Sequence, residues 1–411
     1  MIFTGFSPNL TGRDTLIALS WLLFPWKWRS LSRGDNPRKA EDELKKYFGF
    51  KSAYTFDSGR TALYFALKAL GIKEGDEVIV QAYTCVVVVN AIRWTGAQPV
   101  YVDIADDFNM DARELEKKIT DKVKAVIVQH TYGLPADLEL IMRLAKKHGL
   151  KIIEDCAHSF GAKHDGKLTG TFGDIGMFSF GSDKILSCIR GGALITNNDN
   201  LGEALKDCQA GLKPMPGKII IQHLLHYPVF YIGKALYGII IGKAILALAK
   251  KLNVINKIIT PEEKAGKKDQ AFGRALPNAL SAILLNQLKE VDKINEKRKK
   301  IAGYYSLKLA IVSGKPARGT DECIFLRYPI LLDNPKELMR AAKNKNILLG
   351  DWYNSVIAPR DSVLAETGYI KGSCPRAERM AERIVNLPTG RGVDKSQADK
   401  IAKLVNSFLE K

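Results

Sequence analysis

Short apolar runs alternate with amphipathic stretches between Ala53 and about Asn198. Apolar runs of this length predict buried strands, and the amphipathic stretches between them predict helices. Strands separated by single helices predict an α/β fold with a mostly parallel, seven-stranded sheet that is covered by helices on both faces. In chain order, the predicted strands are AYTF, EVIVQ, QPVYVDI, KAVIVQ, LKIIED, IGMFSF and GALITN.

The pattern changes after this region. From about Leu276 a long helical stretch, NALSAILLNQLKEVDKINEKRKKIAGYYSLKLA, leads into a smaller α+β region. That region has a predicted strand in CIFLRYPILL, a helix in PKELMRAAKNKN, and terminal helices in CPRAERMAERIVNL and DKSQADKIAKLVNSFL. We therefore expect an N-terminal amphipathic arm (1–35), a large domain (36–275) with an apolar, lysine-rich insert (211–261), and a small C-terminal domain (276–411).

The composition agrees with a large intracellular protein. The 411 residues are 46% hydrophobic, which is enough to bury the cores of two domains. The six cysteines are scattered without a C-x-x-C spacing, which argues against a disulfide framework or a zinc site and fits a reducing cytosol. The first residues lack the basic start and cleavage site of a secretory signal, so we expect a cytoplasmic protein.

The net charge of +18 indicates an acidic partner. The positive charge gathers around two apolar stretches: TLIALSWLLFPWKWRSLSR, with three of the five tryptophans, and the insert, with seven lysines and no Asp or Glu. This layout does not predict nucleic-acid binding. Neither stretch is an uninterrupted membrane span. Two interpretations of these stretches stay open. They bind at the periphery of the anionic inner face of the cytoplasmic membrane, or they form an apolar subunit-packing surface or a buried insert.

Two residues near strand ends point to a specific chemistry. Asp155 ends the predicted strand LKIIED, and Lys184 follows the strand IGMFSF. The carboxyl ends of parallel strands share one edge of a sheet, where ligands bind. A lysine that forms a Schiff base and a carboxylate that keeps a pyridine nitrogen protonated are what pyridoxal phosphate requires. The alternatives are a surface lysine and an aspartate that caps the next turn. His158 either contacts the cofactor or is a core histidine.

The segment DSGRTALYFAL offers a site for the phosphate group of that cofactor. A strand gives way to a helix at Ser58, Gly59 and Arg60. Backbone amides and the positive end of the helix dipole bind anions at such a turn, and Arg60 adds a charge. Ser179 can donate a hydroxyl. A glycine turn before a helix is commonly only structural, so this prediction depends on Asp155 and Lys184.

The runs SGRTAL, EVIVQAYTCVVVVNAI, GAQPVYVDI, IIEDCAHSFGA, MFSFGSDK and GGALITN resemble the DegT/DnrJ/StrS family of pyridoxal phosphate-dependent sugar aminotransferases. The resemblance covers roughly residues 36–411, except the insert. It implies the fold type I architecture of aspartate aminotransferase and a homodimer with shared active sites. It also implies that Lys184 is the Schiff-base lysine, Asp155 the partner of the ring nitrogen, and His158 a cofactor contact. Gly59, Arg60 and Ser179 would hold the phosphate.

The chain departs from the family pattern at several positions. Cys85 stands where an aromatic residue usually stacks on the cofactor, and Arg60 stands where threonine is usual. An asparagine that commonly reaches the phosphate of the partner subunit corresponds to Gly273, with Arg274 or Asn278 as substitutes. A histidine usual near DWYNSVIAP is absent. These departures concern the acceptor substrate and the hold on the cofactor more than the reaction.

The resemblance implies that the protein transfers an amino group from an amino acid, by family analogy glutamate, to a nucleotide-linked keto-sugar for cell-surface polysaccharide or glycan. One alternative is a sugar dehydratase-like enzyme of the same fold, in which a histidine replaces the lysine. Another is a non-catalytic regulatory protein at the membrane surface. The sugar, the carbon that is aminated and the donor are not determined by the sequence.

Overall fold

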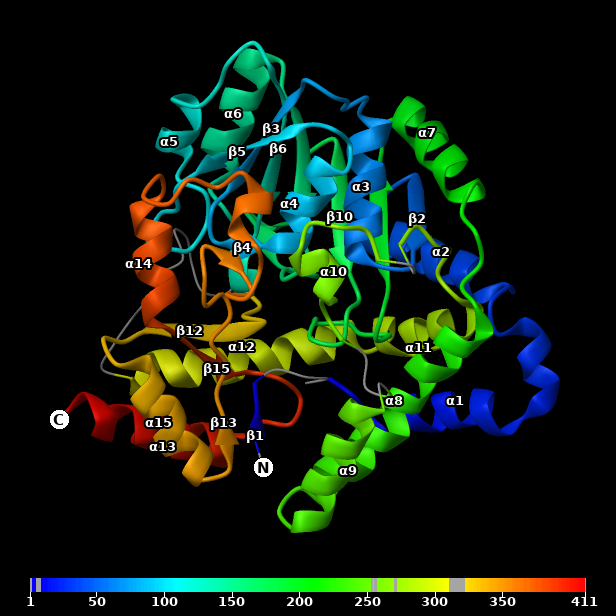
Figure 1. Cartoon of the computed structure of the whole chain (residues 1–411), viewed down its shortest axis with the longest axis vertical. Helices are drawn as coiled ribbons and strands as arrows, with labels where there is room; N and C mark the ends of the chain where they lie inside the picture. Colours follow the sequence, from blue (N-terminus) through cyan, green and yellow to red (C-terminus); the bar gives the residue numbers. More distant parts are fainter. Residues whose placement is uncertain are drawn as a thin grey trace.

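A central sheet with helices on both faces dominates the molecule (Figure 1). The computed structural model describes residues 2–4, 9–252, 254, 257–269, 272–309 and 322–410. In this part of the chain, seven strands lie in the order β2-β11-β10-β7-β6-β3-β5, and only β11 runs antiparallel to its neighbours. The predicted mostly parallel, seven-stranded sheet is confirmed. Its strands are β2 (Ser52–Phe56), β3 (Glu77–Gln81), β5 (Gln98–Val102), β6 (Val123–Gln129), β7 (Lys151–Asp155), β10 (Ile175–Ser179) and β11 (Gly192–Thr196).

Both faces of the sheet are buried. Successive side chains of a strand point to opposite faces. In β3, Val78 and Val80 belong to one core cluster, while Ile79 belongs to another together with Val126. This two-sided burial explains why the strands are continuous apolar runs. The first cluster includes side chains of α3 (Gly59–Ala69) and α4 (Val86–Arg93), and the second includes those of α5 (Ala112–Glu116) and α6 (Leu138–His148).

A third core lies at the β2 end of the sheet. It contains side chains of α2 (Asn36–Phe48), α8 (Gly217–Ala235) and α11 (Asn278–Leu288), packed with β10 and β11. The helix α7 (Asp199–Ala210) packs against β2. The helix α11 packs against α2, so the first helix of the predicted C-terminal domain lies in the core of the N-terminal half.

The C-terminal part differs from prediction in two places. The predicted long helix is broken at Lys289 and Glu290, between α11 and α12 (Val291–Lys308). The residues IVNL form strand β15 (Ile384–Pro388) and not a helix, because they pair antiparallel with β12 (Arg327–Leu331). The remaining helices are α13 (Pro335–Asn344), α14 (Pro375–Arg383) and α15 (Lys395–Leu409).

The arm and the insert form helices at one corner of the molecule (Figure 1). The helix α1 (Gly12–Leu23) is followed by a short 3-10 helix, η1 (Pro25–Ser30). In the insert, α8 packs against both α1 and α9 (Ile240–Lys251), and a short helix, α10 (Pro261–Lys264), follows. Among the described residues, no helix is both long enough and apolar enough to span a bilayer.

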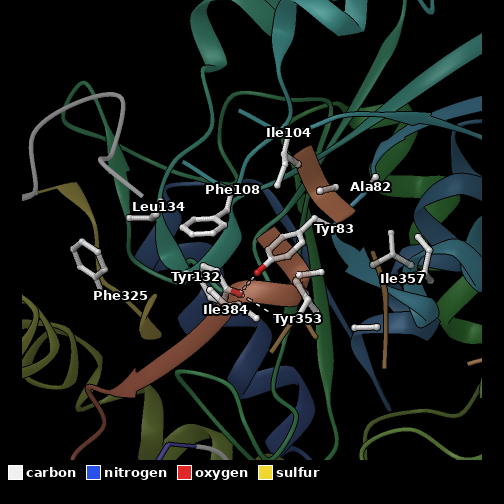
Figure 2. Close-up of a cluster of buried hydrophobic side chains, with 14 of the residues drawn as sticks. Ala82, Tyr83, Ile104, Phe108, Tyr132, Leu134, Phe325, Tyr353, Ile357 and Ile384 are labelled. Carbon is white, nitrogen blue, oxygen red and sulfur yellow. Dashed lines mark hydrogen bonds between the residues drawn. The ribbon is translucent and has the colours of Figure 1, made fainter. Parts of the chain in front are cut away.

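An aromatic cluster joins the C-terminal part to the sheet (Figure 2). The hydroxyls of Tyr83 and Tyr132 form a 2.7 Å hydrogen bond, and the ring of Tyr353 lies 5.5 Å from that of Tyr83. Two short strands close in sequence to this cluster, β4 (Thr84–Cys85) and β14 (Ile357–Ala358), pair in parallel. This pairing joins Cys85 to the C-terminal part of the chain. Other short pairs are β1 (Ile2–Phe3) with β13 (Ile347–Leu348) and β8 (Lys163–His164) with β9 (Lys167–Leu168).

Candidate active site

A cavity opens where the carboxyl ends of β7 and β10 lie side by side. Asp155 is the last residue of β7, and Lys184 follows the end of β10 by five residues. The cavity encloses about 790 Å³ including its open mouth. Seven of the eight predicted site residues line it: Ser58, Gly59, Arg60, Cys85, Asp155, Ser179 and Lys184. His158 is outside this lining.

The N-terminus of α3 forms one end of the cavity. Ser58 caps the helix, because its Oγ accepts a hydrogen bond from the amide of Thr61 at 3.3 Å. Gly59 lies against Ser179, and a Cβ atom at position 59 would lie 2.8 Å from the Cβ of Ser179. Only glycine fits there without displacing Ser179. The helix dipole and this close approach together suit a phosphate group.

Arg60 lines the cavity, but its guanidinium is held by the end of the insert. It forms an ion pair with the buried carboxylate of Glu263 and donates a hydrogen bond to the carbonyl of Ile258. The predicted phosphate contact of Arg60 stays a prediction, and these two partners already engage its charge and both of its terminal nitrogens.

Asp155 is a buried carboxylate. The amide of Ala157 donates a hydrogen bond to its Oδ1 at 3.0 Å. Burial raises the pKa of Asp155, while that amide and the positive charge of Lys184 act in the opposite direction. A cationic ring nitrogen beside it would also favour the ionised form.

Lys184 belongs to a charged group that joins both parts of the chain. Its Nζ lies 3.5 Å from the carboxylate of Asp183, and Arg327 of β12 donates to the same oxygen, Oδ2, at 3.2 Å. Burial alone would raise the pKa of Asp183, but the charges of Lys184 and Arg327 outweigh it and hold the pKa below its usual value. Asp183 therefore carries a full negative charge beside the lysine amine.

His158 lies buried between two tyrosines. Its Nδ1 accepts a hydrogen bond from the amide of Tyr132 at 3.3 Å, and its Nε2 lies 3.5 Å from the hydroxyl of Tyr353. Burial, followed by the charges of Lys184 and Arg327, holds the pKa of His158 well below its usual value. The imidazole is neutral, with Nδ1 as an acceptor.

Cys85 presents a thiol to the cavity in front of α4. The residue is the N-cap of that helix and is half-buried. Desolvation by the surrounding side chains raises the pKa of the thiol to about 11, although part of the residue faces the cavity. A neutral thiol is a poor nucleophile, so Cys85 supplies a small apolar wall where a larger side chain would narrow the cavity.

Several lining residues were missed in the sequence. Trp352 and Tyr353 come from the C-terminal part, and the insert contributes Lys257, Ile258 and Ile259. Arg190 also lines the cavity, where it pairs with the buried Asp57 at 2.9 Å. The run Arg190-Gly191-Gly192, shortly after Lys184, was a sequence signal for Arg190. No local pattern marks the residues from the C-terminal part and the insert, because only the fold brings them to the cavity.

The structure places the three residues considered for the partner's phosphate. The amide of Gly273 donates to the hydroxyl of Thr61 at 3.4 Å, and the carbonyl of Arg274 accepts from the amide of Asp57 at 3.1 Å. The side chain of Asn278 is used within its own chain, since it bonds to the amide of Asn36 and the carbonyl of Ser30. Asn278 is thus occupied in fixing the arm.

A buried His130–Glu154–Cys156 group has the residue types of a metal site. The carboxylate of Glu154 already accepts hydrogen bonds from the amides of Gly170, Phe172 and Gly173 and contacts the ring of His130 at 3.2 Å. These bonds account for its burial without an ion.

The residues of the cavity fit pyridoxal phosphate. Three buried side-chain atoms of lining residues have neither a hydrogen-bond partner nor an ion pair within the described part of the chain: Oγ of Ser182, Oδ1 of Asp183 and Nε1 of Trp352. Buried polar atoms are normally satisfied, so a polar ligand in the cavity would complete them. The helix N-terminus, Lys184 and Asp155 supply an anion site, an amine and a carboxylate in one place.

A mixed seven-stranded sheet with a lysine and an aspartate at its carboxyl edge, beside a helix N-terminus, is the architecture of the fold type I aminotransferases that this chain resembles. The model of the DegT/DnrJ/EryC1/StrS aminotransferase family matches residues 26–216 and 247–406, and the chain belongs to this family.

Similar proteins and solved structures support the family assignment. The chain is 30% identical over 388 residues to a GDP-perosamine synthase from Vibrio cholerae, which covers 92% of each protein. It is 42% identical over 197 residues to a GDP-perosamine synthase from Escherichia coli O157:H7, and this match spans 48% of the chain and 53% of that protein. The structure of DesV from S. venezuelae, in complex with a ketimine intermediate, is 26% identical, with a TM-score of 0.74 and coverage of 97% and 95%.

Proposed function

We propose that this aminotransferase moves an amino group from an amino acid, by family analogy glutamate, to a nucleotide-linked keto-sugar used for cell-surface glycan. The observation that carries the proposal is the convergence of Lys184, Asp155 and the N-terminus of α3 on one cavity. The GDP-perosamine synthases among the relatives support a nucleotide-linked sugar as the acceptor.

Pyridoxal phosphate, when bound, supplies an aldehyde for the amine of Lys184 and a ring that withdraws electrons from the carbon being deprotonated. Asp155 would pair with the protonated ring nitrogen, whose positive charge would favour the ionised form of this buried carboxylate. The amides at the start of α3 and the hydroxyl of Ser179 bind the phosphate and fix the cofactor's orientation.

Lys184 has the second chemical role. When a donor amine has replaced it, its Nζ would remove the proton from the donor's α-carbon and return a proton as the reaction proceeds. Asp183 is 3.5 Å from Nζ and stays ionised, so it holds the amine of Lys184 in position in the cavity. Arg327 holds Asp183 in turn.

Aromatic side chains of the C-terminal part line the cavity, and the neutral His158 contacts one of them, Tyr353. His158 is fixed by Tyr132 and Tyr353. Trp352 and Tyr353 line the cavity and bring the C-terminal part into the site. We propose that these residues exclude water from the reacting carbon and that His158 contacts the cofactor ring.

The same proposal includes two features of the setting. By family resemblance the enzyme acts as a homodimer, with a residue of each subunit completing the other's site. It is cytoplasmic and binds the inner face of the membrane at its periphery, as the cationic, tryptophan-rich stretches indicate.

The experiment is an activity screen of the pyridoxal phosphate-loaded protein against a panel of keto-sugar nucleotides, with glutamate as donor. We expect one acceptor to be aminated with ping-pong kinetics, because donor and acceptor use one site in turn. The Lys184→Ala variant is the control and should lose activity against every acceptor. A protein that binds the cofactor but aminates no nucleotide-linked sugar would contradict the proposed substrate class.

The sugar dehydratase alternative is disfavoured by Lys184, since that branch has a histidine at this position. The non-catalytic alternative is disfavoured because Asp155, Lys184 and the glycine at position 59 are all retained in one cavity. Release of an amino-free, dehydrated sugar in the same screen would favour the dehydratase.

A further inference from the structure

Exposed apolar side chains are concentrated in the arm and the insert. Of the fifteen large apolar side chains that are exposed in the described part of the chain, five lie within residues 16–28 and seven within residues 231–252. Trp26 is 69% exposed and Ile240 is 84% exposed. The other three, Leu307, Val363 and Ile370, lie in the C-terminal half. A concentration of this kind marks an interaction surface.

These side chains belong to elements that pack side by side. The helix α8 contacts both α1 and α9, and all three lie at one corner of the molecule (Figure 1). Gly233 of α8 lies so close to Leu246 that a Cβ atom would meet that side chain at 2.6 Å. With Leu246 turned toward α8, the residues Ile240, Ala244 and Leu248, spaced by four, form an exposed apolar stripe along α9.

This corner coincides with segments outside the family match. The family model matches residues 26–216 and 247–406, which leaves out 1–25, 217–246 and the last five residues. The unmatched residues include all of α1 and α8 and the first half of α9. Most of this corner therefore lies outside the family match, while nearly all of η1 and the end of α9 lie within it.

The charge of the surface has one sign. Residues 211–261 contain seven lysines and no Asp or Glu. Lysines lie over aromatic rings here, with Lys27 5.3 Å from the ring of Trp21 and Lys243 5.6 Å from that of Tyr237. The one acidic side chain of α1, Asp14, is buried and accepts hydrogen bonds from Asn286 and Gln287.

We infer that α1, η1, α8 and α9 form a docking surface for an anionic lipid bilayer, with the exposed stripe of α9 lying in the headgroup region. This docking surface rests on the membrane location in the proposed function. It adds which helices contact the membrane and which kind of lipid they bind. An anionic bilayer accepts tryptophan, isoleucine and leucine at the acyl boundary and lysine at the headgroups. A second copy of the chain would bring lysines against lysines, so the one-signed charge opposes self-association through this face.

The test is flotation of the full-length, cofactor-loaded protein with two kinds of vesicle, phosphatidylglycerol–phosphatidylcholine and phosphatidylcholine alone. We expect the protein to float with the anionic vesicles, at least about tenfold more than with the neutral ones, and to be released by salt. The variant Ile240→Glu/Leu248→Glu should lose this binding. Its control, Leu307→Glu/Ile370→Glu, changes two equally exposed apolar residues elsewhere and should bind like the natural protein.

A second variant covers the case in which the glutamates disturb α9. Lys250→Ala/Lys251→Ala alters only exposed lysines and should weaken anionic binding by roughly fivefold for each lysine. Its control is Lys343→Ala/Lys345→Ala, at exposed positions of the C-terminal part.

Equal flotation of the Ile240→Glu/Leu248→Glu variant and its control would overturn the inference. So would a natural protein that ignores anionic vesicles, or one that forms larger oligomers dispersed by that variant, which would make a second copy the occupant. Transaminase activity in solution is measured separately, so its failure affects the proposed function and not the docking surface.

Discussion

The surroundings of Lys184 differ from those of other lysines in the chain. The amine of Lys184 lies beside an ionised, buried carboxylate, whereas Lys257, which also lines the cavity, is exposed. The proximity of Lys184 and Asp155 was predictable, because Asp155 ends β7 and Lys184 follows the adjacent parallel strand β10. The role of Arg327 was not, since it contacts Asp183 from 144 residues away along the chain. The same holds for Tyr353 beside His158.

Gly59 offers a direct test of the phosphate site. In the variant Gly59→Ala the new methyl group would press on Ser179, because its carbon would lie 2.8 Å from the Cβ of that residue. Overpacking of this kind costs about 1–3 kcal/mol, so we expect roughly 5- to 150-fold weaker cofactor binding, measured by absorbance titration of the apoprotein. The variant Gly303→Ala, which meets no atom within 4 Å, should bind normally. Unchanged binding in Gly59→Ala would place the phosphate elsewhere.

Arg327 tests the charged group that holds Lys184. The side chains of Arg327 and Asp183 are only 7% and 4% exposed. Replacing Arg327 by methionine therefore leaves a buried carboxylate with one of its two cationic partners. Breaking a buried pair in this way costs about 3–5 kcal/mol, so Arg327→Met should lose that much stability in urea unfolding. Arg383→Met removes an exposed pair with Asp333 and should cost about 1 kcal/mol or less. Equal losses in the two variants would show that burial of the Asp183–Arg327 pair has no special effect.

At the scale of elements, the strands of the sheet were predicted because burial on both faces makes them continuous apolar runs. The failures lie where contacts decide the conformation. IVNL continues the amphipathic pattern of α14 in the sequence, but pairing with β12 makes it a strand. The break at Lys289 and Glu290 separates α11, in the core with α2, from α12, where no glycine or proline gave a signal. The lining residues of the insert could not be predicted, because only packing brings residues 257–259 to the cavity.

A buried histidine on helix α8 should make the stability of the protein fall in acid. Burial, followed by the charge of Arg190, lowers the pKa of His223 from 6.5 to about 3. Unfolding frees this imidazole to take a proton, so the unfolded state binds more protons below pH 6.5 and stability falls as the pH drops toward 3.

The variant His223→Leu removes this proton uptake. Relative to the natural protein, its loss of unfolding free energy between about pH 7.5 and pH 5 should be smaller by about 2 kcal/mol, measured by urea unfolding at both pH values. His148→Leu, at an exposed position of α6, controls for the loss of a histidine. If both variants lose as much stability as the natural protein, His223 is not protonated on unfolding in this range.

At the scale of the whole molecule, three parts of the chain meet at one cavity. The sheet provides Lys184 and Asp155, the C-terminal part provides Trp352 and Tyr353, and the insert provides residues 257–259. The insert also carries the exposed apolar stripe of α9. The proposed active site and the proposed docking surface therefore share the insert.

The central claim is that Lys184 is the residue that bonds to pyridoxal phosphate. The most direct test is borohydride reduction of the purified, cofactor-loaded protein, followed by mass spectrometry of its peptides. We expect a yellow protein that becomes colourless on reduction and carries one phosphopyridoxyl group on Lys184. A protein that takes up no cofactor, or a phosphopyridoxyl group on another lysine such as Lys257, would contradict this claim.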